Sequence, residues 1–182
     1  MGGKLTGRKA IIVGGGGGIG GAIARRFHIE GAAVGIVDVD EKAIEARVAE
    51  LKDGPGTAQV FSIAIDISNP EGAKWAVSEV SNAIGGLDIS VHSAASRDPT
   101  APTEYTEIEN WNEAIRVNLT SMFLQCKYVI PELRAKGGGV IINIASQLGS
   151  VVTPGRPAYH ATKGAVIQLT KAIAVETTQD NI

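Results

Sequence analysis

The sequence is poor in features on which several classes of protein depend. Cys126 is the only cysteine, so no disulfide can form within the chain and a cysteine-based zinc site is not expected. Lys and Arg form no long run and the net charge is −2, which argues against a nucleic-acid-binding surface or a basic membrane patch. No run of about 18 apolar residues occurs, and the first residues contain no apolar signal segment. We therefore expect a soluble, cytoplasmic protein without nucleic-acid or membrane partners.

Aromatic residues are also scarce, at 4%, whereas apolar residues make up 44% and charged residues 20% of the chain. This composition is typical of a folded globular domain and unlike that of a disordered segment. A length of 182 residues suits one compact domain, and we find no internal repeat or linker. We therefore expect residues 1–182 to form a single domain.

Short apolar runs alternate with longer amphipathic stretches along the chain. The expected strands cover residues 9–13, 33–37, 58–65, 87–91 and 140–144, and the expected helices cover residues 19–30, 41–51, 70–84, 107–135 and 158–177. Strands and helices that alternate in this way form parallel sheets through right-handed crossovers. The sequence therefore predicts an α/β fold with a doubly wound, Rossmann-like parallel sheet. Pro131 is expected to bend or divide the longest helix.

Five consecutive glycines begin at Gly14, between the first expected strand and the first expected helix. A residue without a Cβ atom lets the chain turn sharply and lets a pyrophosphate approach the positive end of the helix. The glycine pattern alone is weak, because so many glycines satisfy almost any template. Its place between a strand and a helix favours a dinucleotide site over a flexible surface turn.

Asp38 closes the second expected strand. A carboxylate at this point can accept hydrogen bonds from both hydroxyls of an adenosine ribose and would repel a 2′-phosphate. The sequence places no Arg or Lys in the glycine loop or directly after Asp38, so the cofactor predicted is NAD rather than NADP. The alternative is a helix cap, which either Asp38 or Asp40 could provide.

Tyr159 and Lys163 lie four residues apart on one expected helix, and therefore on the same face of it. Ser146 follows the fifth expected strand, and Asn118 lies within the longest helix. The Tyr-x-x-x-Lys spacing is common by chance, but this combination in this order, after the glycine loop, resembles the short-chain dehydrogenase/reductase family. The resemblance extends from Leu5 to the last residue of the chain.

The resemblance implies a site for each of these residues. Its implied cofactor-binding residues are Gly14, Gly18, Ile19, Gly20, Asp38, Asp66, Ile67, Ala94, Tyr159 and Lys163. Its implied catalytic residues are Ser146, Tyr159, Lys163 and Asn118, and no metal is implied. The implied reaction is hydride transfer between NAD(H) and a secondary alcohol or carbonyl substrate.

The chemistry of these residue types agrees with such roles. Alcohol oxidation needs a base for the hydroxyl proton, and a nearby lysine ammonium favours the phenolate form of a tyrosine. Ser146 can donate to the substrate oxygen as charge develops on it. Asn118 is expected to hold Lys163 through water. An ordinary surface pair of tyrosine and lysine is the alternative.

The sequence also departs from the family pattern. Val13 stands where the family usually has Thr, and His92-Ser93-Ala94-Ala95 stands where it usually has Asn-Asn-Ala-Gly. We expect His92 to bond a neighbouring backbone group and to have a structural role. His28 and His160 are expected at the surface, and Trp75 and Trp111 are expected to anchor helix packing.

The chain ends where family members continue with further strands, so we expect a domain truncated after the fifth strand and its following helix. A truncated nucleotide-binding protein without turnover is the alternative function. A nucleotide-sugar epimerase would need a larger substrate domain. The resemblance further implies a homo-oligomer, either a tetramer or a dimer, formed through the helices at 107–135 and 158–177. Apolar residues on the longer helix, including Ile115, Leu119, Met122 and Phe123, favour this expectation.

Overall fold

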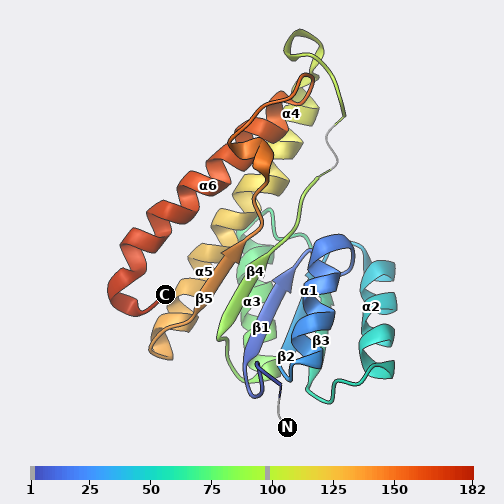
Figure 1. Ribbon diagram of the computed structural model, residues 1–182, viewed down its shortest axis with the longest axis vertical. Helices are drawn as coiled ribbons and strands as arrows, with labels where there is room; N and C mark the ends of the chain where they lie inside the picture. Colours follow the sequence, from blue (N-terminus) through green and yellow to red (C-terminus); the bar gives the residue numbers. More distant parts are fainter. Residues whose placement is uncertain (1–2, 97–98) are drawn as a thin grey trace.

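The computed structural model describes residues 3–96 and 99–182, which contain a five-stranded parallel sheet (Figure 1). The strands are β1 (Lys9–Val13), β2 (Ala33–Asp38), β3 (Val60–Ala64), β4 (Ile89–His92) and β5 (Val140–Asn143). They lie in the order β3-β2-β1-β4-β5, and every neighbouring pair is parallel. The order reverses between β1 and β4, which is the point where open α/β sheets bind ligands. The predicted Rossmann-like fold class is confirmed.

Helices connect the strands, and most begin and end where the sequence predicts. The longer helices are α1 (Gly18–Ile29), α2 (Glu41–Asp53), α3 (Pro70–Ile84), α4 (Ile108–Ala114), α5 (Ser121–Ala135) and α6 (Pro157–Thr177). The 3-10 turns are η1 (Thr103–Tyr105), η3 (Gln147–Gly149) and η4 (Thr178–Asp180). Helix α3 shows the local signals clearly, because Asn69 caps its first turn and Gly85 ends it in the left-handed conformation.

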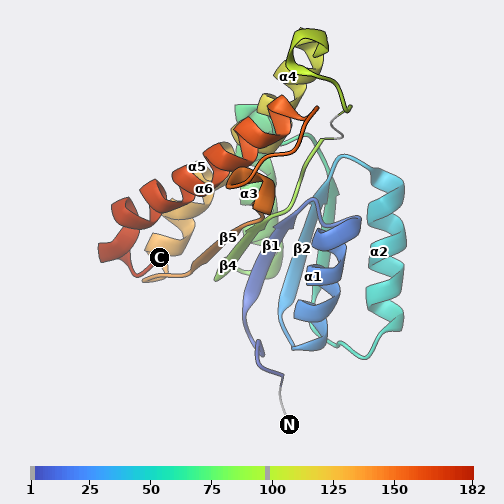
Figure 2. The same cartoon turned by 45° about the horizontal axis from the view of Figure 1, so that its top comes forward.

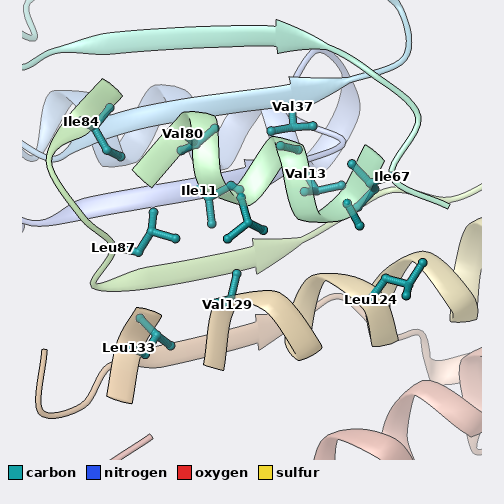
Figure 3. Packing of buried hydrophobic residues seen from close by; sticks show 13 residues of the cluster. Ile11, Val13, Val37, Ile67, Val80, Ile84, Leu87, Leu124, Val129 and Leu133 are labelled. Atoms are coloured by element: carbon teal, nitrogen blue, oxygen red, sulfur yellow. The ribbon is translucent and has the colours of Figure 1, made fainter. Parts of the chain in front are cut away.

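Two hydrophobic clusters cover the two faces of the sheet. Helices α1 and α2 contribute Ala24, Ile44 and Leu51 to one cluster, together with β1 and β2. Helices α3 and α5 cover the other face, where Val80, Val129 and Leu133 are fully buried. Figure 3 shows these side chains pointing from the helices toward the strands. Because all five strands are parallel, their carboxyl ends and the loops that follow them lie at the same edge of the sheet.

Helix α6 belongs to a third cluster and lies alongside α5 (Figures 1 and 2). Met122 and Cys126 of α5 pack against Val166 and Ile173 of α6. Burial raises the pKa of the Cys126 thiol to about 11, so that the thiol remains protonated at neutral pH. The prediction that Met122 contributes apolar surface for a partner is therefore wrong, because α6 covers it completely.

The longest helical stretch departs from regular geometry in a place that the sequence does not predict. A π-helical segment, η2 (Ile115–Thr120), joins α4 to α5, and helical backbone angles continue across both junctions. The expectation that Pro131 would divide the helix is wrong, since Pro131 lies inside α5 and the helix continues to Ala135. The irregularity falls instead at the segment that carries Asn118.

Two smaller expectations are also wrong. His28 is only 3% exposed, because it packs against the turn at Gly56, and it is therefore not a surface residue. Trp75 is 50% exposed on α3 and does not anchor the packing of that helix. His160 is half-buried and bonds the loop before α6, through Leu148 and Thr153.

Candidate active site

A cleft of about 790 Å³ lies at the carboxyl ends of the strands, over the point where the strand order reverses. Figure 1 shows α4 and the beginning of α6 extending beyond these strand ends. The predicted site residues that line the cleft are Gly14, Gly18, Ile19, Asp38, Asp66, Ile67, Ala94, Tyr159 and Lys163. Residues predicted from distant parts of the sequence are thus brought together in one cavity.

The glycine loop turns tightly beneath this cleft. Gly14 has a φ of +72°, and a Cβ atom there would approach the backbone nitrogen of Ala94 to 2.6 Å. Gly20 does not line the cleft, but a Cβ atom on it would meet the carbonyl oxygen of Gly14 at 2.1 Å. These two glycines therefore let α1 and the loop after β4 approach β1 closely.

The amino end of α1 faces the open cleft with bare backbone. Gly17 is the N-cap residue of this helix and makes no side-chain capping bond. Both Gly17 and Gly18 line the cleft, and a Cβ atom on either would have no neighbour within 4 Å. The N–H groups of the first turn are therefore available to an anionic ligand, which the helix dipole also favours.

The carboxylate of Asp38 is fixed at the side of this loop. One oxygen accepts hydrogen bonds from the backbone N–H groups of Val39 at 2.8 Å and Asp40 at 3.2 Å. The other oxygen accepts from the N–H of Gly16 at 3.0 Å. Asp40, and not Asp38, caps α2, by accepting from Ala43. Asp38 is therefore left to line the cleft.

Asp66 lines the cleft beside a residue that the sequence analysis missed. Arg116 of η2 forms an ion pair of 2.6 Å with Asp66 and also bonds both carboxylate oxygens of Glu113. Hydrogen bonds from Ser68 together with this arginine lower the pKa of Asp66 in spite of its partial burial. Arg116 and Glu113 both line the cleft. They resemble an ordinary exposed helix pair in the sequence, which gives no signal of the contact with Asp66.

Tyr159 and Lys163 lie on the first turns of α6 and both line the cleft. The ammonium of Lys163 donates to the carbonyl of Ile144 at 2.7 Å and lies 5.8 Å from the centre of the Tyr159 ring. The guanidinium of Arg156 lies 5.1 Å from the same ring. Burial lowers the pKa of Lys163. The tyrosine is therefore flanked by two cationic groups.

Asn118 and Ser146 lie close to the cleft but are not among the residues that line it. The Asn118 side chain is 1% exposed; its oxygen accepts from the Ser96 N–H at 2.8 Å and its nitrogen donates to Thr162 at 3.3 Å. Thr162 directly precedes Lys163. The Ser146 hydroxyl accepts from the Leu148 N–H at 3.1 Å and caps η3.

His92 has a different partner from the one expected. Its Nε2 atom lies 2.8 Å from the Ser121 hydroxyl, which is a side chain of α5 and not a neighbouring backbone group. Burial, with a smaller contribution from the Lys163 charge, lowers the pKa of His92 to about 3. The imidazole is therefore neutral at physiological pH.

The part of the chain that the structure describes contains no group of three or more His, Cys, Asp or Glu side chains placed to hold a metal ion. Within residues 3–96 and 99–182, no helix combines the length and apolar character that crossing a membrane requires.

Comparison with known sequences gives a consistent result. Residues 8–182 match the family model described as short chain dehydrogenase. The 2,5-dichloro-2,5-cyclohexadiene-1,4-diol dehydrogenase of Sphingobium indicum is 39% identical over 176 residues, which are 97% of this chain and 69% of that protein. A probable galactose dehydrogenase of Rhizobium meliloti is 35% identical over 178 residues, which are 98% of this chain and 69% of that protein.

Solved structures agree with these relatives. An NAD⁺-bound xylitol dehydrogenase has a TM-score of 0.94 at 28% identity, with 98% of this chain and 68% of that chain covered. A 7α-hydroxysteroid dehydrogenase complexed with NADH and a 7-oxo bile acid has a TM-score of 0.91 at 29% identity, with the same coverage. The chain therefore belongs to the short-chain dehydrogenase family.

Proposed function

We propose that the protein transfers a hydride between NAD(H) and a secondary alcohol or carbonyl substrate, with Tyr159 as the acid or base. One observation carries this proposal: a single cleft is lined by Asp38 and the glycine loop as well as by Tyr159 and Lys163. A nucleotide site alone would not need a tyrosine and a lysine in the same cavity.

The residues of the cleft fit a dinucleotide. The bare backbone at Gly17 and Gly18 leaves room for a pyrophosphate at the amino end of α1. Asp38 retains acceptor capacity for ribose hydroxyls beyond its three backbone bonds, since a carboxylate offers about four lone-pair sites. Ile19, Ile67 and Ala94 supply apolar lining. The nicotinamide, when bound, supplies the hydride donor or acceptor.

The protein's own groups would manage the proton. Tyr159 would take the hydroxyl proton during alcohol oxidation and return it during carbonyl reduction. The ammonium of Lys163 would stabilise the phenolate and bind the nicotinamide ribose. Ser146 would donate to the substrate oxygen, and Asn118 would support Lys163 through the water it orders. In the described arrangement, Lys163 Nζ bonds the Ile144 carbonyl and Asn118 contacts Thr162 beside it.

We propose that the protein prefers NAD(H) to NADP(H). The Asp38 carboxylate would repel a 2′-phosphate at the position where it binds the ribose. Among the cleft-lining residues, Arg116 and Lys163 are the basic ones, and Arg116 is already held by Glu113 and Asp66. The NAD⁺ and NADH bound to two similar solved structures support the same preference.

The relatives suggest where a substrate search should begin. Their names refer to a cyclic diol, to galactose, to D-threitol and to L-fucose, all of which are compounds with several hydroxyl groups. We propose that polyhydroxylated secondary alcohols form the substrate class of this protein as well. We also propose a homo-oligomer, because Phe123 on α5 and Val175 on α6 remain 45% and 79% exposed.

The proposed acid/base role is tested by Tyr159→Phe. This change keeps the ring and removes the oxygen, so turnover should fall roughly hundredfold or more while the Kd for NAD⁺ stays within about twofold. NAD⁺ reduction is followed spectroscopically with a panel of diols, alditols and sugars, and Kd is measured by calorimetry. Tyr128→Phe, on α5, is the matched control and should leave both quantities unchanged. A Tyr159→Phe protein that keeps a third of its turnover would refute the role.

A further inference from the structure

Two buried polar contacts join β4 to α5. Gln125 Nε2 donates to the Ser90 hydroxyl at 2.7 Å and to the Val91 carbonyl at 3.2 Å. His92 Nε2 lies 2.8 Å from the Ser121 hydroxyl. All four of the paired side chains are at most 3% exposed. The two contacts are alike in burial and in the elements they join. Only the second reaches the π-helical segment η2, and of the four residues only Ser121 lines the cleft.

Ser121 shows how that second contact acts on η2. Its backbone N–H bonds the carbonyl of Arg116, five residues earlier, as π-helical geometry requires. Its hydroxyl donates to the carbonyl of Val117, four residues earlier. The side chain of Ser121 therefore satisfies the carbonyl that its own backbone N–H would bond in a regular α-helix.

The direction of these bonds defines the role of His92. The single hydroxyl proton of Ser121 is used on Val117, so the bond between His92 and Ser121 requires a proton on Nε2. A neutral imidazole with its proton on Nε2 provides that donor. His92 thus holds the serine hydroxyl in the orientation that satisfies the Val117 carbonyl, directly before Asn118.

We infer that His92 is a positioning residue, which acts through Ser121 on η2 and so holds Asn118 in place for the proton transfer. This inference rests on the function proposed above, in which Asn118 supports Lys163. Asn118 is held by contacts of 2.8 Å to Ser96 and 3.3 Å to Thr162, and a shift of η2 would disturb both of them. A displacement of about 1 Å near the reacting groups can cost up to about a hundredfold in rate.

The test compares the two contacts between β4 and α5. His92→Phe removes the donor and retains a ring of similar size, while Ser121→Ala removes the hydroxyl. Each should lower kcat by roughly ten- to hundredfold. For His92→Phe, at a residue that does not line the cleft, the Kd for NAD⁺ should change by less than about twofold. Ser90→Ala removes the equally buried contact to Gln125 and is the matched control. Ser90→Ala should leave kcat within about twofold of wild type, even if it lowers the melting temperature as much as His92→Phe does.

Two further variants separate positioning from a general loss of packing. His92→Gln places an amide donor near the original Nε2 position and should restore most of the rate lost in His92→Phe. The double variant His92→Phe with Asn118→Ala should be no slower than Asn118→Ala alone, because His92 acts through Asn118. Failure of rescue by Gln, or independent rate losses that multiply in the double variant, would overturn the inference.

The outcome is also distinguishable from failure of the proposed function. If Tyr159→Phe and Asn118→Ala keep wild-type turnover, the proposed catalytic roles fail, whatever His92 does. If Tyr159→Phe and Asn118→Ala are slow while His92→Phe and Ser121→Ala match wild type, the proposed function stands and only the positioning role of His92 is wrong.

Discussion

In the proposed function, Asp38 is the cleft-lining residue that distinguishes NAD from NADP. Its carboxylate is fixed by three backbone N–H groups, so it cannot turn away from a 2′-phosphate without losing them. Asp38→Ala should therefore reduce the preference for NAD over NADP by about tenfold or more, equivalent to about 1.4 kcal/mol. Titration of wild type and variant with both cofactors measures the change. Asp40→Ala, which removes the cap of α2, is the control and should lower stability without changing the preference.

His92 should also make the stability of the fold sensitive to acid. Its pKa is lowered from 6.5 to about 3 by burial, so the unfolded chain binds a proton on His92 below pH 6.5 while the folded chain does not. The residue has almost no effect above pH 7 and becomes increasingly destabilising as the pH falls from 6.5 toward 3. Between pH 7.5 and pH 5 this amounts to about 2 kcal/mol.

Urea unfolding of wild type and His92→Gln at both pH values isolates this contribution from those of the other titrating groups. Wild type should lose about 2 kcal/mol more than the variant over this range, because only wild type can protonate position 92. If both proteins lose the same free energy of unfolding between pH 7.5 and pH 5, the pKa of His92 does not differ between the folded and unfolded chains as its burial requires.

At the scale of elements, the strands and most helices could be predicted because their signals are local. The cap at Asn69, the first-turn Pro70 and the left-handed Gly85 all lie next to the helix that they delimit. Pro131 was expected to interrupt α5 on the same local grounds. The helix continues because Val129 and Leu133, on either side of the proline, are fully buried against the sheet and hold the helix there.

The π-helical segment could not be predicted, because it depends on residues far apart in the sequence. The Ser121 hydroxyl bonds the Val117 carbonyl and also contacts His92, which lies 29 residues away in the sequence. The same reason hides Arg116, whose contact with Asp66 spans 50 residues. The glycine loop, Asp38, Tyr159 and Lys163 were recognisable because their combination and order along the chain resemble the pattern of the family.

At the scale of the whole molecule, the described surface carries exposed apolar side chains on helices α5 and α6. Phe123 and Val175 lie on α5 and α6, the helices for which the family resemblance implies contacts between copies. We predict that the protein sediments as a dimer or tetramer at micromolar concentration, and that Phe123→Asp shifts it toward the monomer by burying an unpaired charge. Trp75→Asp, at a 50% exposed position on α3, is the control and should leave the assembly unchanged. A wild-type monomer at these concentrations would contradict the prediction.

The family resemblance implies that Asp66 contacts the adenine of the cofactor, and the ion pair between Arg116 and Asp66 bears on this proposed contact. A carboxylate that faces the cleft alone would select adenine by accepting a hydrogen bond from its 6-amino group, whereas here the carboxylate is already shared with Ser68 and a guanidinium. Four of the five N–H groups of Arg116 bond Glu113, Asp66 and Ser68, and the remaining one can donate to a 6-oxo group. We therefore expect the protein to use the hypoxanthine analogue of NAD⁺ with a KM within about threefold of that for NAD⁺. A threefold ratio is about 0.7 kcal/mol, which is within the range of one hydrogen bond. Arg116→Ala should increase the ratio of the two KM values in favour of NAD⁺. Steady-state titration with both dinucleotides measures the ratio, and a strong preference of wild type for adenine would contradict this prediction.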